Sequence, residues 1–265
     1  MKADIGWSGL SVSLVLVAVA VALSRWRQLG LERSILWAAS RALVQLLAVG
    51  VALDLVLDPG RTLAWSWLWV AAMLAIAATV VRWRAREVPG IFPLSLAAFG
   101  AAAFVSLGVL FGLGVFELDG RTLIPLAGLM LGNSMAATIL VSRRVLEELR
   151  DKRTEVEARL ALGQTSTEAA RPYLRAALRT ALIPQIETTK AVGLVVLPGA
   201  MTGLILAGAE PLDAVRVQAA VMYLVLGAVA TTTAVVAIGV SRRMFTADHR
   251  LDWRLVGTDR PAERA

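Results

Sequence analysis

Long apolar runs separated by short polar segments make up most of this chain. Seven runs reach or approach the about 20 residues that a helix needs to cross a bilayer core: 5–23, 35–57, 63–81, 91–116, 123–141, 191–209 and 214–240. Inside a bilayer all backbone hydrogen bonds have to be made within the protein, and a helix makes them within one segment. The pattern therefore predicts an all-α fold, a polytopic transmembrane helical bundle of about seven spans.

Lysine and arginine are concentrated on alternate connections between these runs. One set of connections, taken with the C-terminal tail, holds 22 of them; the other set holds four, and Arg41 lies inside a run. Because basic residues accumulate on cytoplasmic loops, the count predicts an outside N-terminus, an inside C-terminus and a multi-pass protein of the plasma (inner) membrane. We expect one transmembrane domain over residues 1–265, with a cytoplasmic loop at about 142–190 and a short basic tail at 241–265.

Composition agrees with a membrane protein and excludes several kinds of site. Hydrophobic residues make up 57% of the chain and charged residues 18%, against about 25% in a soluble domain. The net charge of +7 comes from basic residues at the ends of the runs, so we expect the lipid bilayer, and no nucleic acid, as a partner. With no cysteine and only His249, in the tail, a cysteine-based zinc site and a Ser-His-Asp triad in the membrane are excluded, and we expect no enzyme.

The loop at about 142–190 is the one long connection, and its sequence is helical in pattern. Thr154 with Glu157 fits a capping box, and Thr165 with Glu168 fits a second. Gly163 lies between them as a helix stop. We expect a short helix, a break at Gly163, and a capped helix that kinks at Pro172 and returns to the membrane near Pro184. Such a helix either docks into a partner's groove or is a solvated hairpin, and its periodicity favours neither.

The segment Glu157-Ala-Arg-Leu-Ala-Leu-Gly163 is similar to the E-A-A-x-x-x-G loop by which ABC importer permeases dock on their ATPase. It departs from that pattern at the third position, where Arg159 stands for alanine. The Ile-x-Leu-Pro that usually follows is replaced by Ile183-Pro184, farther downstream.

A longer series of motifs resembles the FetB-type permeases, an ABC transporter family linked to iron export and represented in plants by aluminium-tolerance half-transporters. The series is Gly-Leu-Met-Leu-Gly-Asn-Ser-Met at 128–135, the 157–163 loop, Ala-Leu-Ile-Pro at 181–184, Lys-Ala-Val-Gly at 190–193, Leu-Pro-Gly-Ala-Met-Thr-Gly at 197–203, Ile-Leu-Ala-Gly at 205–208 and Pro-Leu-Asp-Ala-Val-Arg-Val-Gln at 211–218. Arg41 and Gln45 also match. The resemblance covers nearly the whole chain and is strongest over 128–218.

This resemblance implies a permease that exports iron, another metal or a metal-linked solute and forms a homodimer on a pair of cytoplasmic ABC ATPase subunits. No G-x-x-x-x-G-K-[ST] occurs in the chain, so we expect the partner to use ATP-Mg and this chain to bind no cofactor. The coupling segment implied by the resemblance comprises Glu155, Glu157, Ala158, Leu160 and Gly163.

The candidate translocation pathway rests on residues that are unusual within apolar runs: Arg41, Gln45, Asn133, Met135, Pro198, Gly199, Met201 and Thr202. A proline and glycines inside a span favour a broken helix lining a cavity, or a packing kink. An arginine with a glutamine four residues later either faces the pathway or snorkels to the interface. Asn133 either bonds across helices or faces the pathway.

The sequence leaves the metal ligands and one other class of transporter open. Met130, Met135, Met201, Met222 and a few carboxylates are the available metal ligands, and methionine in a membrane helix is more often packing. The alternative function is an ATP-independent secondary transporter of a small solute. Such a protein is expected to show internal repeats and buried carboxylates for coupling ions, whereas the runs show no repeat and hold almost no Asp or Glu.

Overall fold

The computed structural model describes residues 7–57, 62–193, 197–246, 248 and 250–252. These residues form helices, with one isolated β-bridge between Phe245 and Leu251. In chain order the helices are α1 (Trp7–Trp26), α2 (Glu32–Val56), α3 (Leu63–Arg84), α4 (Ile91–Ala102), η1 (Ala103–Leu107), α5 (Gly108–Gly112), α6 (Gly120–Asp151), α7 (Arg153–Ala161), α8 (Ser166–Ala191), α9 (Gly199–Leu206) and α10 (Pro211–Arg243).

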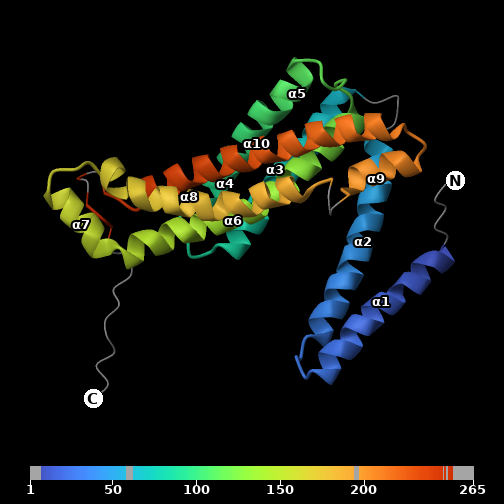
Figure 1. Ribbon diagram of the computed structural model, residues 1–265, viewed down its shortest axis with the longest axis horizontal. Coiled ribbons are helices and arrows are strands. Elements are labelled where there is room, and N and C mark those ends of the chain that lie inside the picture. The colour runs from blue at the N-terminus through green and yellow to red at the C-terminus, as the bar shows by residue number, and fades with distance from the viewer. Residues whose placement is uncertain (1–6, 58–61, 194–196, 247, 249, 253–265) are drawn as a thin grey trace.

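The core of the bundle lies between α6 and α10, which run side by side and are flanked by α3, α4 and α8 (Figure 1). Small residues are buried on both helices, among them Ala127 on α6 and Ala228 and Ala237 on α10. Small side chains let helix backbones approach closely, which is how membrane helices gain packing energy in the absence of a hydrophobic drive between them. We call the end of the bundle that holds Arg84, Arg143 and Arg243 the basic end.

The α1–α2 hairpin projects from this bundle (Figure 1). No residue of the apolar part of α2 is buried, and the extensive contacts of α2 are with α1. At the end opposite the basic end, Leu57 lies beside the start of α6, where an ideal Cβ on Gly120 would be 3.1 Å from its Cδ2. The hairpin is therefore joined to the bundle at one end of α2 and diverges from it at the other.

Among the described residues, five helices are long and apolar enough to cross a membrane, and they confirm a membrane helical bundle: Glu32–Asp54, Leu63–Arg84, Ile91–Gly112, Gly120–Asp151 and Pro211–Arg243. The segment Ser11–Trp26 is a shorter apolar helix. The span at 91–112 contains the π-helical turn η1, which inserts a wide turn between α4 and α5. The start of the first predicted run and most of the predicted tail, 253–265, lie outside the described residues.

The sixth predicted span, 191–209, is wrong as a single helix. The helix α8 continues to Ala191, where that span was predicted to begin, and α9 has eight residues. Eight residues extend about 12 Å, which is less than half of the about 30 Å core.

The long loop is more helical than predicted. α6 extends through Asp151, ten residues into the segment expected to be loop. Thr165 and Glu168 form the predicted capping box, but the predicted box at Thr154 is wrong, because α7 begins at Arg153 and Lys152 is its N-cap without a side-chain cap bond. α8 continues through both Pro172 and Pro184 as one helix.

Candidate functional site

The helix α7 lies beyond the basic end, between the long helices α6 and α8 that carry it (Figure 1). Val156 is fully buried, and Leu160 packs against the core that α6 and α8 extend to this point. A nine-residue helix is marginal in water by itself. These two apolar side chains therefore fix the short helix on the bundle and leave its other face to solvent.

Glu155 ties α7 to α8 through hydrogen bonds. Its carboxylate accepts a bond from the Tyr173 hydroxyl at 3.0 Å and pairs with Lys152 at 3.0 Å. The bond from Lys152, followed by that from Tyr173, lowers the pKa of Glu155 below its ordinary value of 4.5. Glu155, a predicted coupling residue, is thus engaged within the chain and positions α7.

The outward face of α7 holds two other predicted coupling positions, Glu157 and Ala158, and one residue that sequence reasoning missed, whereas the predicted coupling residue Leu160 packs inward. Ala158 is exposed, and Glu157 pairs with Arg153 at 2.7 Å. Leu162, which follows α7 as its C-cap residue, is 83% exposed. A large apolar side chain at the tip of a polar loop could have been noticed from the sequence, because the residue just before a helix-stop glycine projects from the helix end.

Gly163 ends α7 in the left-handed region, with φ of +86°. Its N–H donates to the Leu160 carbonyl at 3.0 Å, and the Gln164 N–H donates to the Arg159 carbonyl at 3.2 Å. These two bonds form a Schellman motif. An ideal Cβ at Gly163 would meet nothing within 4 Å, so it is the backbone conformation, and not a lack of space, that favours glycine here.

Two arginines hold the turn between α3 and α4 at the basic end. Arg143 of α6 pairs with Glu87 at 2.5 Å and also donates to the Arg84 carbonyl. Arg243 of α10 donates to the Pro89 carbonyl at 3.2 Å and to the Gly90 carbonyl. In the sequence these arginines indicate topology alone, because their partners are 56 and more than 150 residues away.

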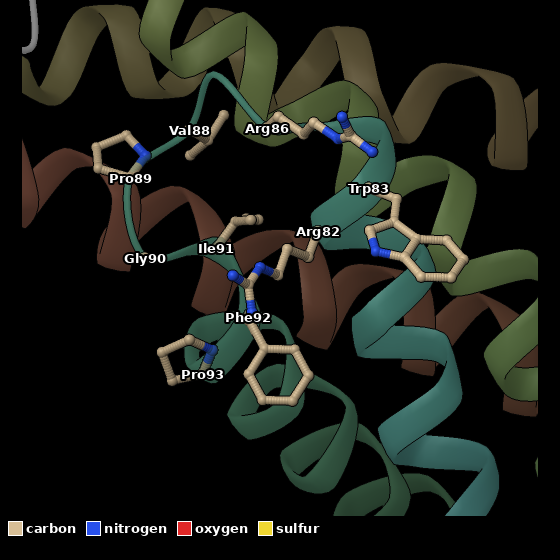
Figure 2. Close-up of a pocket in the computed structure, with 9 residues that line it drawn as sticks. All are labelled: Arg82, Trp83, Arg86, Val88, Pro89, Gly90, Ile91, Phe92 and Pro93. Carbon is tan, nitrogen blue, oxygen red and sulfur yellow. The ribbon is translucent and has the colours of Figure 1, made fainter.

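A cavity of about 620 Å³ opens beside this turn (Figure 2). Its lining comes from the end of α3, the turn and the start of α4, and comprises Arg82, Trp83, Arg86, Val88, Pro89, Gly90, Ile91, Phe92 and Pro93. The Arg82 guanidinium extends toward Phe92 and Pro93, and Arg86 points the other way. Neither forms an ion pair with a described residue, so the cavity is positively charged and chemically suited to anionic groups.

The structure spreads the candidate pathway residues over three places. Arg41 and Gln45 lie exposed on α2; Asn133 and Met135 lie on α6; and Pro198, Gly199, Met201 and Thr202 start α9. Pro198 is the N-cap of α9, with φ of −66° and ψ of 147°, so a helix starts at Gly199, and the role of this segment in the pathway stays a prediction. The contacts of α9 are mainly with α10. Within the described part of one chain these residues form no common cavity.

Asn133 and Met135 lie on different sides of α6. Met135 packs against the core, whereas Asn133 is exposed and its Nδ2 donates to the Leu129 carbonyl at 2.8 Å. Asn133 lines a groove of about 250 Å³, here named the α6–α8 groove, together with Gly132, Ala136, Ala137, Leu140, Ala181, Pro184, Gln185, Thr188 and Val229.

The described residues contain no group of three or more His, Cys, Asp or Glu that could hold a metal ion. Of the candidate methionines, Met130 is fully buried in the core, and Met135, Met201 and Met222 are half-buried. The three half-buried methionines lie on three different helices, α6, α9 and α10.

Comparison with known proteins places the chain in a family. Residues 7–245 match the family described as "Uncharacterised protein family (UPF0014)". The chain is a member of UPF0014. The match covers every described helix through α10, so the bundle, α7 and the α6–α8 groove of this UPF0014 chain all fall within the family region.

Curated relatives cover most of this UPF0014 chain. It is 40% identical to "UPF0014 membrane protein STAR2" of Oryza sativa subsp. japonica over 212 residues. These residues make up 80% of this chain and 74% of the relative. It is 33% identical over 245 residues, 91% and 93% of the two chains, to "Probable iron export permease protein FetB" of Escherichia coli (strain K12). "Protein ALUMINUM SENSITIVE 3" of Arabidopsis thaliana is 34% identical over 219 residues, 82% and 80%. No solved structure matches the chain.

Proposed function

We propose that this chain is the membrane-spanning permease subunit of an ABC transporter, coupled through α7 to a separate ATPase subunit. The observation that carries the proposal is the build of α7. A short helix is fixed to the bundle by Val156, braced by Glu155 and Tyr173, and presents Leu162 at its tip. A rigid apolar projection beyond the membrane bundle suits insertion into a groove of a partner.

Other features support the same proposal. α6 and α8 carry α7 well beyond the basic end, which is where positive charge predicts the cytoplasm. An ATPase cannot reach the membrane core, so a lever of this kind is required to transmit its movement. The match covers 93% of the length of the relative named "Probable iron export permease protein FetB". On that likeness we propose iron, another metal or a metal-linked solute as cargo, and export as the direction.

The ABC mechanism also predicts a homodimer, because ABC ATPases act in pairs, an expectation that comes from the family resemblance. Each permease chain then presents one α7 to one ATPase subunit. The single chain leaves Arg41 and Gln45 exposed and buries no residue of α9 fully, which agrees with a bundle that is completed by a second copy.

Transport in inside-out membrane vesicles tests this function against an ion-driven carrier. Vesicles that contain the chain and its ATPase are expected to accumulate iron only with ATP-Mg, and vesicles with the chain alone are expected to accumulate none. The purified chain is expected to bind no nucleotide, because it has no phosphate-cradling loop. Accumulation driven by an ion gradient without ATP, or stoichiometric nucleotide binding by the isolated chain, contradicts the proposal.

A further inference from the structure

One face of α2 is left uncovered by the single chain. Its members recur three or four positions apart and so lie on one side of the helix: Ser34, Ala38, Arg41, Gln45, Ala48 and Ala52, named here the polar face. At 100° per residue it points away from α1, because Leu36, Ala39 and Leu43 line the space between the two helices. Arg41 and Gln45 have no polar partner among the described residues.

A guanidinium in the bilayer interior needs hydrogen-bond acceptors, which lipid tails do not offer. Arg41 follows the start of α2 by nine residues, or about 13 Å of helix. We therefore expect the polar face to pack against a protein surface that has hydrogen-bond acceptors and small side chains.

The α6–α8 groove has this chemistry. Asn133 donates through Nδ2 to the Leu129 carbonyl, which leaves its Oδ1 to accept, and the half-buried Gln185 side chain has no partner among the described residues. Pro184 has no N–H to give the Thr180 carbonyl, so that carbonyl also remains an acceptor. Gly132 would place a Cβ in open space, so the floor of the groove admits another helix closely.

The polar face and the groove lie at matching distances along their helices. Leu57 and Gly120 are neighbours at the end opposite the basic end. Gln45 precedes Leu57 by 12 residues, and Asn133 follows Gly120 by 13. At 1.5 Å per residue both are about 18–20 Å from that contact, measured along their own helices. An α2 that packs along the α6 of a second copy with these two ends aligned therefore brings Gln45 level with Asn133.

The α2 helix of the same chain is attached on the wrong side of α6 to fill this groove. An ideal Cβ on Gly120 would meet Ser66 of α3 and Leu57, so α2 joins the bundle on the α3 side. Ala136 and Leu140 of the groove lie about 160° around α6 from Gly120. The hairpin also diverges from the bundle (Figure 1). The groove thus faces a second chain.

We propose that the polar face of α2 docks in the α6–α8 groove of a second copy of this chain, and that the second copy's α2 docks reciprocally. The proposal rests on the homodimer of the proposed function and names its interface. Gln45 faces the partner's Asn133, and Arg41 is bonded by the acceptors of the groove. Two chains then cover the polar surface that each leaves open.

Cysteine cross-linking tests this interface without background, because the chain has no cysteine. Gln45→Cys in a chain with one tag and Asn133→Cys in a chain with another are produced together in membranes and treated with a bifunctional maleimide. The expected product carries both tags at about twice 28.2 kDa. The matched control replaces Gln45→Cys by Leu43→Cys, which lies on the α1 side of α2 and is expected to give no such product.

A second pair of cysteines tests the same interface in case the first pair is poorly placed for cross-linking. Ala48→Cys and Leu129→Cys each lie nine residues from the Leu57–Gly120 contact and are expected to give the two-tag product. Failure of both pairs, equal yield with Leu43→Cys, or a link confined to a single chain that carries both Gln45→Cys and Asn133→Cys overturns the proposal. Cross-linking needs no ATPase. A negative cross-linking result therefore contradicts this interface without contradicting the proposed coupling through α7.

Discussion

The turn between α3 and α4 shows how single residues fix the basic end. Gly90 has a positive φ of +63° and its carbonyl accepts from Arg243. A Cβ at Gly90 would collide with that guanidinium. The backbone conformation therefore favours glycine here, and a side chain would also displace the Arg243 guanidinium. Gly90 lines the cavity beside Arg82 and Arg86.

Gly90→Ala is accordingly expected to destabilise the chain by about 1–2 kcal/mol from the left-handed backbone alone, with a further loss from the displaced Arg243. Thermal unfolding in detergent measures the effect. Gly100→Ala is the matched control, because a Cβ there has open space within α4, and alanine in a helix is favoured over glycine by up to about 1 kcal/mol. Equal stability of the two variants contradicts this reading of the turn.

At the scale of elements, the end of α7 depends on backbone conformation rather than on space. Gly163→Val places a β-branched residue at φ of +86° and is expected to displace Leu162 and uncouple transport while membrane insertion is retained. Gly163→Asn is the matched control, since asparagine tolerates this conformation. Recovery of the ATPase with each variant, together with expression level, gives the readout. Full association and full transport by Gly163→Val would refute the role of this helix stop.

The elements that could be predicted from the sequence are those with a strong local signal. The apolar runs predicted the five long helices, and Thr165 with Glu168 predicted the start of α8. The same spacing at Thr154 gave a wrong prediction of a capping box, because α7 begins earlier, at Arg153, and Glu157 pairs with Arg153 inside the helix. The continuation of α8 through Pro184 was not visible in the sequence, because a proline weakens a helix without fixing where it ends.

The residues that could not be predicted depend on distant partners. Arg143 meets Glu87 and Arg243 meets Gly90 only because α6 and α10 pack beside the α3–α4 turn. Glu155 was assigned to a partner's surface from its place in the loop, yet Tyr173 of α8 engages it. The candidate pathway was a set of unusual residue types, and residue type does not say which helices bring them together.

At the scale of the whole molecule, the predicted orientation has direct consequences for labelling. Thr62 and Thr122 lie at the end opposite the basic end, and Thr154 is exposed on α7. Single cysteines at these positions are expected to react with a membrane-impermeant maleimide in intact cells at Thr62 and Thr122 only, because the bias of basic residues places α7 in the cytoplasm. Labelling at Thr154 in intact cells would reverse the orientation.

Coupling through α7 is tested most directly by charging its apolar tip. Leu162→Asp replaces the side chain proposed to insert into the ATPase, and burial of one leucine contributes about 1.5–3 kcal/mol, so the ATPase recovered with the tagged chain is expected to fall about tenfold or more. Leu29→Asp, at another exposed leucine in the α1–α2 connection, is expected to leave recovery unchanged. Equal recovery of the ATPase with Leu162→Asp and with the unsubstituted chain would contradict the proposed coupling.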